Sequence, residues 1–274
     1  MPEPVTTLGL GAITAYLAKD GLQKLLGPTA EYLGGELAEF TKKRSDNIGK
    51  IFQNANKKLG NKVETEGSVP PKVLKGIIND ASFNDDKIAI EYFGGVLASS
   101  RTKDGRDDRG ARMTKIVDEL STYQLRTHYL IYKTVKELFK SKVDNSLSTS
   151  EGRNKMEIFI PFNHYIGLMD FSEEEFTNIE PLIRHIFFGL SNDGLIENNF
   201  SYGNSEDIIS KAKKSTFAKD GGIICQPSAL GAELFLWAYG ESNKSLEYIF
   251  DNNFKPHMED MPTAINEAIS TKET

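Results

Sequence analysis

Apolar residues recur every three or four positions through most of the first half of the chain, a spacing typical of amphipathic helices. One such run extends from Leu33 to Leu59. Pro28 suits the first turn of this segment, because the N–H that proline lacks would have no intrahelical acceptor there. The pattern predicts one long helix near residues 28–60. Further helical segments follow, so we expect residues 1–142 to form an all-helical domain.

Three local signals mark where further helices begin. Pro70-Pro71 precedes an apolar run and suits the start of a helix. The sequence Asn84-Asp85-Asp86 breaks that run and supplies an N-cap for the next one. Ser121 is a suitable N-cap for the segment TYQLRTHYLIYKTVKELFK. Between the last two lies an almost wholly charged stretch, residues 99–112, which we expect to be a solvated loop.

Small side chains form a stripe along the start of the long helix. The stripe consists of Ala30, Gly34, Gly35 and Ala38. Small residues at this spacing allow two helix backbones to approach closely. Three glutamates lie in the same turns, and each carboxylate would cost about 2.5 kcal/mol or more at the centre of a bilayer. We therefore expect packing in water, against the preceding helix or a second copy of the protein.

The pattern changes after residues 143–154, a polar, serine-rich segment that we predict to be a linker. In residues 155–254 the expected order is strand, helix, helix, strand, turn, strand, helix, which is typical of a winged-helix module. Its wing would pair residues 195–200 with residues 222–226 around a long tip. Residues 255–274 form a tail with a short helix starting at Pro262. The predicted fold is mainly α, with an N-terminal helical bundle followed by a winged-helix-like α+β module.

Charge and cysteine content narrow the classes of partner and compartment. The net charge is −6, but residues 1–150 carry +4 and the remainder carries −10, so the second half is a poor match for a polyanion such as DNA. The single cysteine, Cys225, excludes an intramolecular disulfide framework and fits a reducing compartment. The N-terminus shows no secretory pattern, and its apolar run is 14 residues long, whereas a membrane span needs about 20. We predict a cytoplasmic protein.

Residues with catalytic or metal-binding chemistry do not occur in recognisable groups. The four histidines are at least 21 residues apart, and no pair has the spacing of metal ligands. No P-loop motif is present, and the glutamates that follow Ser172 suit a helix N-terminus. Cys225 lies in an apolar run and is interpreted as a buried thiol. We therefore predict no catalytic residue, no metal and no cofactor, and a protein that is not an enzyme.

Two basic clusters are candidate binding sites. The first lies in the charged loop and consists of Arg101, Lys103, Arg106, Arg109 and Arg112. It is interpreted either as a solvated loop or as a disordered site that binds an acidic phage or host protein. The second lies in the wing tip and consists of Lys211, Lys213, Lys214 and Lys219. It is the alternative site for nucleic acid, although the expected recognition helix, residues 179–192, is mostly apolar and favours protein docking or dimerisation.

Several segments together resemble a bacterial family known as abortive infection alpha. They are LLGPTAEYLGGELAEF, VPPKVLKGIINDASFNDDKIAIEYFGGVLASS, SNDGLIENN and QPSALGAELFLWAYG, and the resemblance extends from about residue 20 to residue 240. It implies antiphage defence, in which an infected cell is stopped or killed before progeny emerge. The family provides no established catalytic residues.

The preferred hypothesis is a non-enzymatic effector or sensor that acts through a phage or host protein, or through self-association. Two alternatives stay open at this point. In one, the glycine-rich N-terminal helices are released on activation and associate with a membrane. In the other, the winged-helix-like module is a DNA-binding regulator that uses the wing-tip lysines, although we expect no nucleic-acid partner for so acidic a half.

Overall fold

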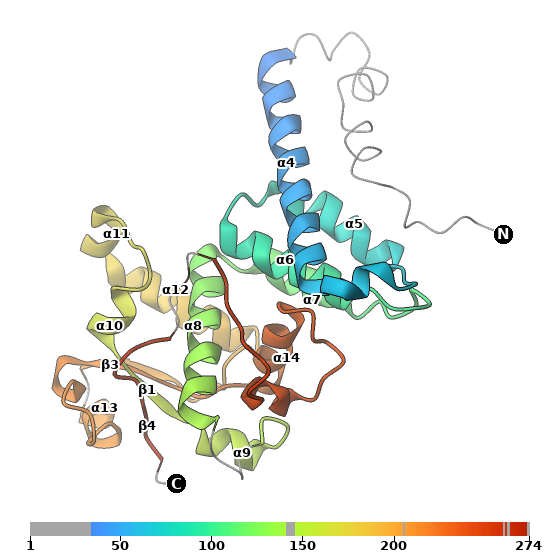
Figure 1. Ribbon diagram of the computed structural model, residues 1–274. Coiled ribbons are helices and arrows are strands. Elements are labelled where there is room, and N and C mark those ends of the chain that lie inside the picture. The colour runs from blue at the N-terminus through green and yellow to red at the C-terminus, as the bar shows by residue number, and fades with distance from the viewer. Residues whose placement is uncertain (1–33, 141–145, 205, 260, 262–263, 273–274) are drawn as a thin grey trace. The chain divides into compact units, whose positions relative to one another are not determined.

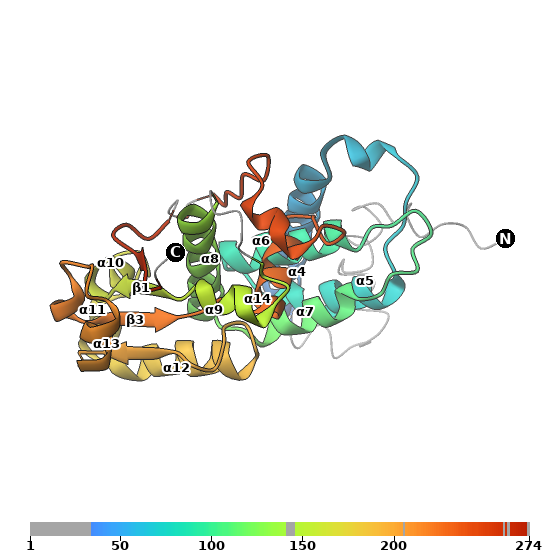
Figure 2. The same cartoon turned by 90° about the horizontal axis from the view of Figure 1, so that it is seen from below.

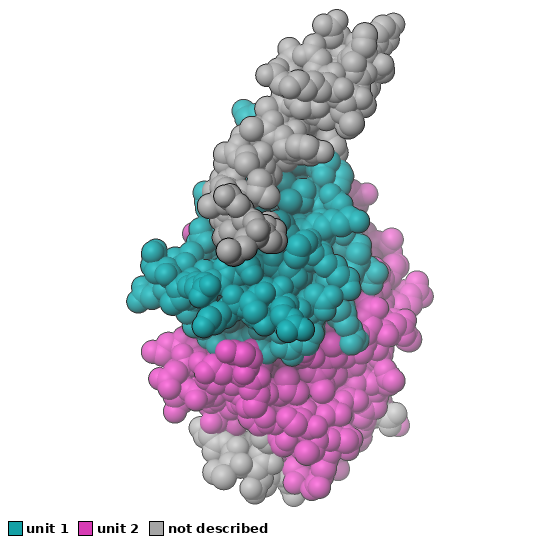
Figure 3. Space-filling view, turned by 90° about the vertical axis from the view of Figure 1, so that its right-hand side faces the viewer, with its two compact units in different colours: residues 1–119, 237–242 teal, residues 120–236, 243–274 magenta. Residues whose placement is uncertain are grey.

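The computed structural model describes residues 34–140, 146–204, 206–259, 261 and 264–272, with the side chains of residues 34–41 and 207 left out. Figure 1 shows a mainly helical chain with one small four-stranded antiparallel sheet, which confirms the predicted mainly α class. Its contacts divide it into two compact units, coloured separately in Figure 3. Unit 1 contains the residues up to Glu119 together with residues 237–242. Unit 2 contains residues 120–236 and 243–274.

Unit 1 is helical where the structure describes it, and the start signals predicted at Pro70-Pro71 and Asn84–Asp86 lie at helix N-termini. Its elements are α4 (Gly34–Leu59), η2 (Gly60–Glu64), α5 (Pro71–Asn79), η3 (Ala81–Phe83), α6 (Lys87–Ser99) and α7 (Gly110–Glu119). The long helix is thus confirmed over the range of α4, and its expected part before Gly34 lies outside the described residues. Pro71 is the first residue of α5. Asp86 caps α6 by accepting hydrogen bonds from the amides of Ile88, at 2.9 Å, and Ala89, at 3.4 Å.

Two glycines of α6 allow neighbouring segments of unit 1 to pack closely against this helix. A Cβ atom at Gly94 would lie 2.5 Å from the Cβ atom of Asn54 in α4. At Gly95 it would lie 2.0 Å from the carbonyl oxygen of Ala238, in the short segment that completes unit 1. Any side chain would separate these backbones, so the sequence GG within α6 is required for the core of this unit.

Unit 2 combines helices with the sheet. Its elements are α8 (Thr122–Phe139), α9 (Ser150–Lys155), β1 (Ile158–Pro161), α10 (Phe162–Ile166), α11 (Glu173–Thr177), α12 (Ile179–Asn192), β2 (Ser201–Gly203), α13 (Glu206–Lys211), η4 (Ala218–Asp220), β3 (Gly222–Cys225), α14 (Ala229–Trp237), η5 (Leu246–Phe250) and β4 (Ile269–Ser270). Ser121 and Gln124 form a capping box at the start of α8, and Ser172 and Glu175 form another at α11. Both predicted N-caps are therefore confirmed.

The sheet has the order β2-β3-β1-β4, and every pair is antiparallel. Figure 2 shows β1 and β3 side by side, and Phe159 of β1 lies opposite Ile224 of β3. These two strands were predicted, but the strand expected at residues 195–200 is wrong, because Ile196 makes only an isolated bridge and β2 begins at Ser201. The short helix expected in the tail is absent from described residues 264–272, where β4 pairs with β1 instead.

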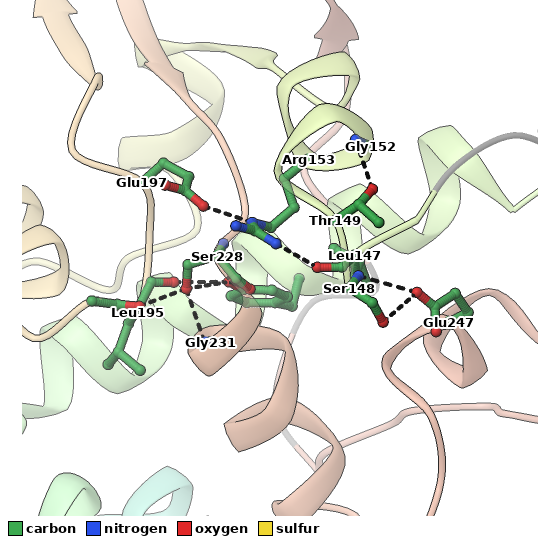
Figure 4. A network of polar contacts seen from close by, with 12 residues as sticks. Leu147, Ser148, Thr149, Gly152, Arg153, Leu195, Glu197, Ser228, Gly231 and Glu247 are labelled. Atoms are coloured by element: carbon green, nitrogen blue, oxygen red, sulfur yellow. Dashed lines mark hydrogen bonds and ion pairs between the residues drawn. The ribbon is translucent and has the colours of Figure 1, made fainter.

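The segment expected to be a linker is folded where the structure describes it. Leu147 is fully buried, and the hydroxyl of Thr149 caps α9 by accepting a 3.1 Å bond from the amide of Gly152. The Glu247 carboxylate accepts hydrogen bonds from the hydroxyls of Ser146, at 3.0 Å, and Ser148, at 2.7 Å. Figure 4 shows the contacts of Ser148 with Glu247 and of Thr149 with Gly152. The serines that indicated a linker therefore bind a carboxylate far away in the sequence.

The long tip expected between the wing strands is also a folded lobe. It contains α13 and η4, and its interior is formed by Ile208, Ala212 and Ala218, which pack against Phe159 and Ile224 of the sheet. The observed division into units also differs from the expected boundary near residue 142, since α8 belongs to unit 2.

Candidate functional site

The charged loop of unit 1 is ordered, because short-range hydrogen bonds fix its backbone. Ser68 and Thr102 form an antiparallel bridge with N···O distances of 2.8 and 3.1 Å. The Asp104 carboxylate accepts bonds from the Thr102 hydroxyl and the Arg106 amide, and the carboxylate of Asp107 accepts one from the amide of the second residue after it. The expectation of a disordered recognition site is therefore wrong, and α7 begins before the end of the charged stretch.

Two of the five cationic side chains of this loop are engaged within unit 1. The Arg101 guanidinium donates to the carbonyl oxygens of Lys62, at 3.0 Å, and Val63, at 3.3 Å, and to a third carbonyl in the same turn. Arg109 forms a bidentate pair with Asp107, and its guanidinium lies 5.7 Å from the ring of Trp237. These two side chains hold the loop in place.

The other three cationic side chains are exposed. They belong to Lys103, Arg106 and Arg112. In the part of the chain that the structure describes, no hydrogen bond or ion pair involves their charged groups, whereas Asp107 and Asp108 of the same loop are paired with cations. The cationic groups left exposed on this loop therefore outnumber the anionic ones.

The stripe of small residues lies at the edge of what the structure describes. Ala30 is outside the described residues, while Gly34, Gly35 and Ala38 lie in the first turns of α4, where only the backbone is described. Among the described side chains of α4, which begin at Lys42, the first buried one is that of Asn47. Self-association through the stripe therefore stays a prediction, as does membrane association through the N-terminal helices. No helix among the described residues combines the length and apolar character needed to cross a bilayer.

The wing-tip lysines share the folded lobe between β2 and β3. Lys211, Lys213, Lys214 and Lys219 are all exposed, and they lie within nine positions of one another in the sequence. The helix expected to read DNA corresponds to α12, whose apolar face is buried through Ile183, Ile186, Phe187 and Leu190. The many apolar residues of α12 are thus explained by packing within unit 2. The lysines of the lobe are therefore the only feature of this module that supports contact with nucleic acid among the described residues.

Two titratable side chains, those of His128 and Cys225, are fully buried in unit 2. The Nε2 atom of His128 lies 3.0 Å from the carbonyl oxygen of Gly231, and burial lowers the pKa of this histidine to about 3. Burial likewise raises the pKa of the Cys225 thiol to about 12, which keeps it protonated and unreactive at neutral pH. Neither residue has the properties of a catalytic base or nucleophile.

Figure 4 shows the polar network that joins the start of α14 to its surroundings. The Ser228 hydroxyl accepts a bond of 2.9 Å from the Gly231 amide and donates one of 2.6 Å to the carbonyl of Gly194. Arg153 pairs with Glu197 at 2.7 Å and also donates to the carbonyl of Leu147. Every group shown has a structural partner, so we interpret this network as part of the fold. Among the described residues, no group of three potential ligands could hold a metal ion.

One feature of unit 2 was missed by the sequence analysis. A cavity of about 360 Å³ lies between the C-terminal part of α8 and the segment Asn252–His257. Four lysines contribute to its lining: Lys133, Lys136, Lys140 and Lys255. Three of them lie at positions i, i+3 and i+7 of α8, a spacing that places side chains on one helix face and could have revealed them. The fourth could not be associated with them from sequence, because it lies more than 100 residues away.

Comparisons with known proteins gave no matching family model, no similar curated protein and no similar solved structure. The resemblance to abortive infection alpha therefore rests on the sequence segments given above.

Proposed function

We propose that this protein is a non-enzymatic binding protein of bacterial antiphage defence, which associates with an acidic protein surface through the loop of residues 101–112. The observation that carries the proposal is the ordered loop on which Lys103, Arg106 and Arg112 are exposed without a partner among the described residues. The defence role itself follows from the family resemblance.

An ordered loop favours this use because a binding surface that is already fixed loses less conformational entropy on association. Exposed charges at the edge of an interface mainly accelerate encounter and select the partner. Arg101 and Arg109 keep the loop fixed, so the exposed cations can meet carboxylates of a partner with little rearrangement. The proposal therefore predicts different effects for the two groups: substitutions of Arg101 and Arg109 should disturb the loop, and substitutions of the exposed cations should weaken binding alone.

For unit 2 we propose a winged-helix-like arrangement used for protein docking. The antiparallel pair β2 and β3, which would be the wing, and α12 support the arrangement, and the exposed Phe188 of α12 supports docking. A second candidate function is nucleic-acid binding, which the four exposed lysines of the lobe favour. A gel shift at low salt tests it, because electrostatic binding is strongest there.

The main experiment measures phage yield and survival of bacteria that carry the gene, at low and high multiplicity of infection. We expect protection at low multiplicity and culture collapse at high multiplicity. The variant Lys103→Glu/Arg106→Glu/Arg112→Glu should lose protection, because it reverses the three exposed cations. The matched control Lys50→Glu/Lys57→Glu/Lys75→Glu makes the same charge change at exposed positions of α4 and α5 and should keep protection. Equal thermal stability of the two variants shows that both are folded.

To identify the partner, a photo-crosslinking amino acid at position 106 is compared with one at position 75 in infected cells. A crosslink that forms only at position 106, with a protein that presents an acidic surface, supports the proposal. Protection that survives reversal of all three loop cations contradicts the assignment of the loop. Absence of protection by the natural sequence across a broad phage panel contradicts the defence role.

A further inference from the structure

The cavity between α8 and the segment Asn252–His257 is unusual because cations dominate its lining. Its described lining includes four lysines and one carboxylate, that of Glu137, so these described residues carry a formal charge of +3 with His257 neutral. Glu137 is 2.7 Å from the ammonium of Lys140 and 4.0 Å from that of Lys133. One carboxylate is thus shared between two lysines.

The two deeper lysines are bound by carbonyl groups, which carry no formal negative charge. The Lys136 ammonium donates to the carbonyl oxygens of Ile249, at 2.8 Å, and Asp251, at 2.9 Å. The Lys133 ammonium donates to the carbonyl of Pro256 at 2.7 Å. Burial lowers the pKa of both lysines, which reflects the incomplete compensation of their charge. These bonds also fix the positions of the ammonium groups in advance.

The negative end of the α8 dipole opposes an anion at this position, but its magnitude is small. It corresponds to roughly half an elementary charge, which the lysines at the cavity outweigh several-fold. The cavity is open to solvent along Asn252, Lys255 and His257, all of which are exposed. A volume of about 360 Å³ is within the range of small-molecule sites.

We propose that this cavity binds the phosphoryl groups of a small molecule, such as a pyrophosphate or a nucleoside polyphosphate. Ammonium groups act as point charges that suit multivalent phosphate oxygens, whereas planar carboxylates are matched best by the fork of an arginine. Bound phosphate neutralises the excess charge of Lys133, Lys136, Lys140 and Lys255. The aromatic ring of Phe254 forms an apolar part of the cavity wall. Its centroid lies 5.5 Å from the Lys136 ammonium, so the apolar and the charged parts of the wall are adjacent. This inference does not depend on the proposed function of the loop.

The test is isothermal titration calorimetry of the full chain with sodium pyrophosphate and with ATP, without added metal and at constant ionic strength. We expect saturable binding of both ligands and little heat from sodium acetate. Lys140→Gln and Lys255→Gln change exposed side chains and should each weaken binding by about fivefold, the effect of losing one solvent-exposed charge pair. The control Lys75→Gln removes an equal charge from the surface of α5 and should leave affinity unchanged.

The variant Glu137→Gln gives a result of opposite sign. Removing the carboxylate that the described lining contains should tighten pyrophosphate binding by about threefold to fivefold. Absence of pyrophosphate binding at millimolar concentration overturns the proposal, as does equal weakening by Lys75→Gln. Binding of a single-stranded oligonucleotide through Lys140 and Lys255 without binding of pyrophosphate also overturns it, and assigns these lysines to nucleic acid instead.

Discussion

The phenol oxygen of Tyr132, on α8, accepts a hydrogen bond of 2.9 Å from the backbone amide of Ser228, at the start of α14. The same phenol donates toward the carbonyl oxygen of Leu195 at 2.8 Å. The first turn of α14 can approach this closely because residue 231 is glycine, where a Cβ atom would lie 2.1 Å from the phenol oxygen. One hydroxyl therefore satisfies two buried backbone groups of unit 2.

Tyr132→Phe should lower the free energy of unfolding of unit 2 by about 1–3 kcal/mol, because it leaves a buried N–H and a buried C=O without their partner. Urea unfolding followed by circular dichroism measures this change. Tyr202→Phe is the matched control, since the Tyr202 side chain is only partly buried and should change stability by less than about 0.5 kcal/mol. Equal stability of the two variants would show that the phenol of Tyr132 does not support the start of α14.

His128 should make the stability of unit 2 depend on pH. Its folded pKa, about 3, lies below the 6.5 of an ordinary histidine because the ring is fully buried. The unfolded chain therefore takes up the proton first as the pH falls. The stabilisation from neutral His128 is complete above about pH 6.5 and is lost progressively toward pH 3, at a limiting slope of about 1.4 kcal/mol per pH unit.

The variant His128→Gln should lack this slope, although it is less stable at pH 7.5. Urea midpoints at pH 7.5, 6.0 and 5.0 compare it with the natural sequence. His257→Gln serves as the control, because His257 is exposed, and it should keep the full pH dependence. If the pH dependence of His128→Gln equals that of the natural sequence, other groups cause it.

Features determined by adjacent residues could be predicted from the sequence. Pro71, Asp86, Ser121 and Ser172 all begin helices where the sequence placed them, because a cap satisfies backbone groups within its own turn. The predicted mainly α class was also correct, because helical periodicity is likewise visible among residues close together in the sequence.

Features that depend on distant residues could not be predicted. Residues 146–149 lie in a serine-rich segment that was interpreted as linker, yet Ser146 and Ser148 are bound by Glu247, about 100 residues later. Strand β4 has two residues, too few for any alternation to be visible, and exists through its pairing with β1. The lysine-lined cavity was missed because α8 supplies only part of its lining, and Lys255 reaches it through the fold.

Gly95 of α6 provides a test of the packing within unit 1. In a helix without neighbours, Gly→Ala would stabilise by about 1 kcal/mol. Here the new Cβ would lie 2.0 Å from the carbonyl oxygen of Ala238, and a backbone atom cannot move aside as a flexible side chain can. Gly95→Ala should therefore destabilise by about 2 kcal/mol or more, the usual cost of overpacking.

Gly167→Ala is the control for this change, because its Cβ would meet only ordinary contacts, the nearest at 3.4 Å from the Asn163 carbonyl oxygen. It should leave the thermal midpoint unchanged or raise it slightly. Thermal unfolding of both variants measures the difference. A Gly95→Ala variant as stable as the natural sequence would show that the Ala238 backbone can retreat from α6.

Arg101 and Arg106 lie in the same charged loop, but the same substitution should destabilise the protein at Arg101 and have little effect at Arg106. The Arg101 guanidinium donates to the carbonyl oxygens of residues 62, 63 and 65, at the end of η2. Arg101→Gln should lower the free energy of unfolding of unit 1 by about 1 kcal/mol, a modest value because these bonds are exposed to water. Arg106→Gln removes no recorded side-chain bond and should change stability by less than about 0.5 kcal/mol.

Hydrogen exchange of residues 60–68 distinguishes the two variants more sharply than global unfolding does. Exchange there should accelerate in Arg101→Gln, because the guanidinium holds this turn against the loop, and should be unchanged in Arg106→Gln. Loss of partner binding by Arg106→Gln with unchanged exchange would then identify a contact residue. Loss by Arg101→Gln with faster exchange would identify a residue that acts by positioning the loop. If exchange accelerates equally in both variants, the total charge of the loop determines its stability. Arg101 would then have no specific positioning role, and Arg106 could not be assigned a role in binding alone.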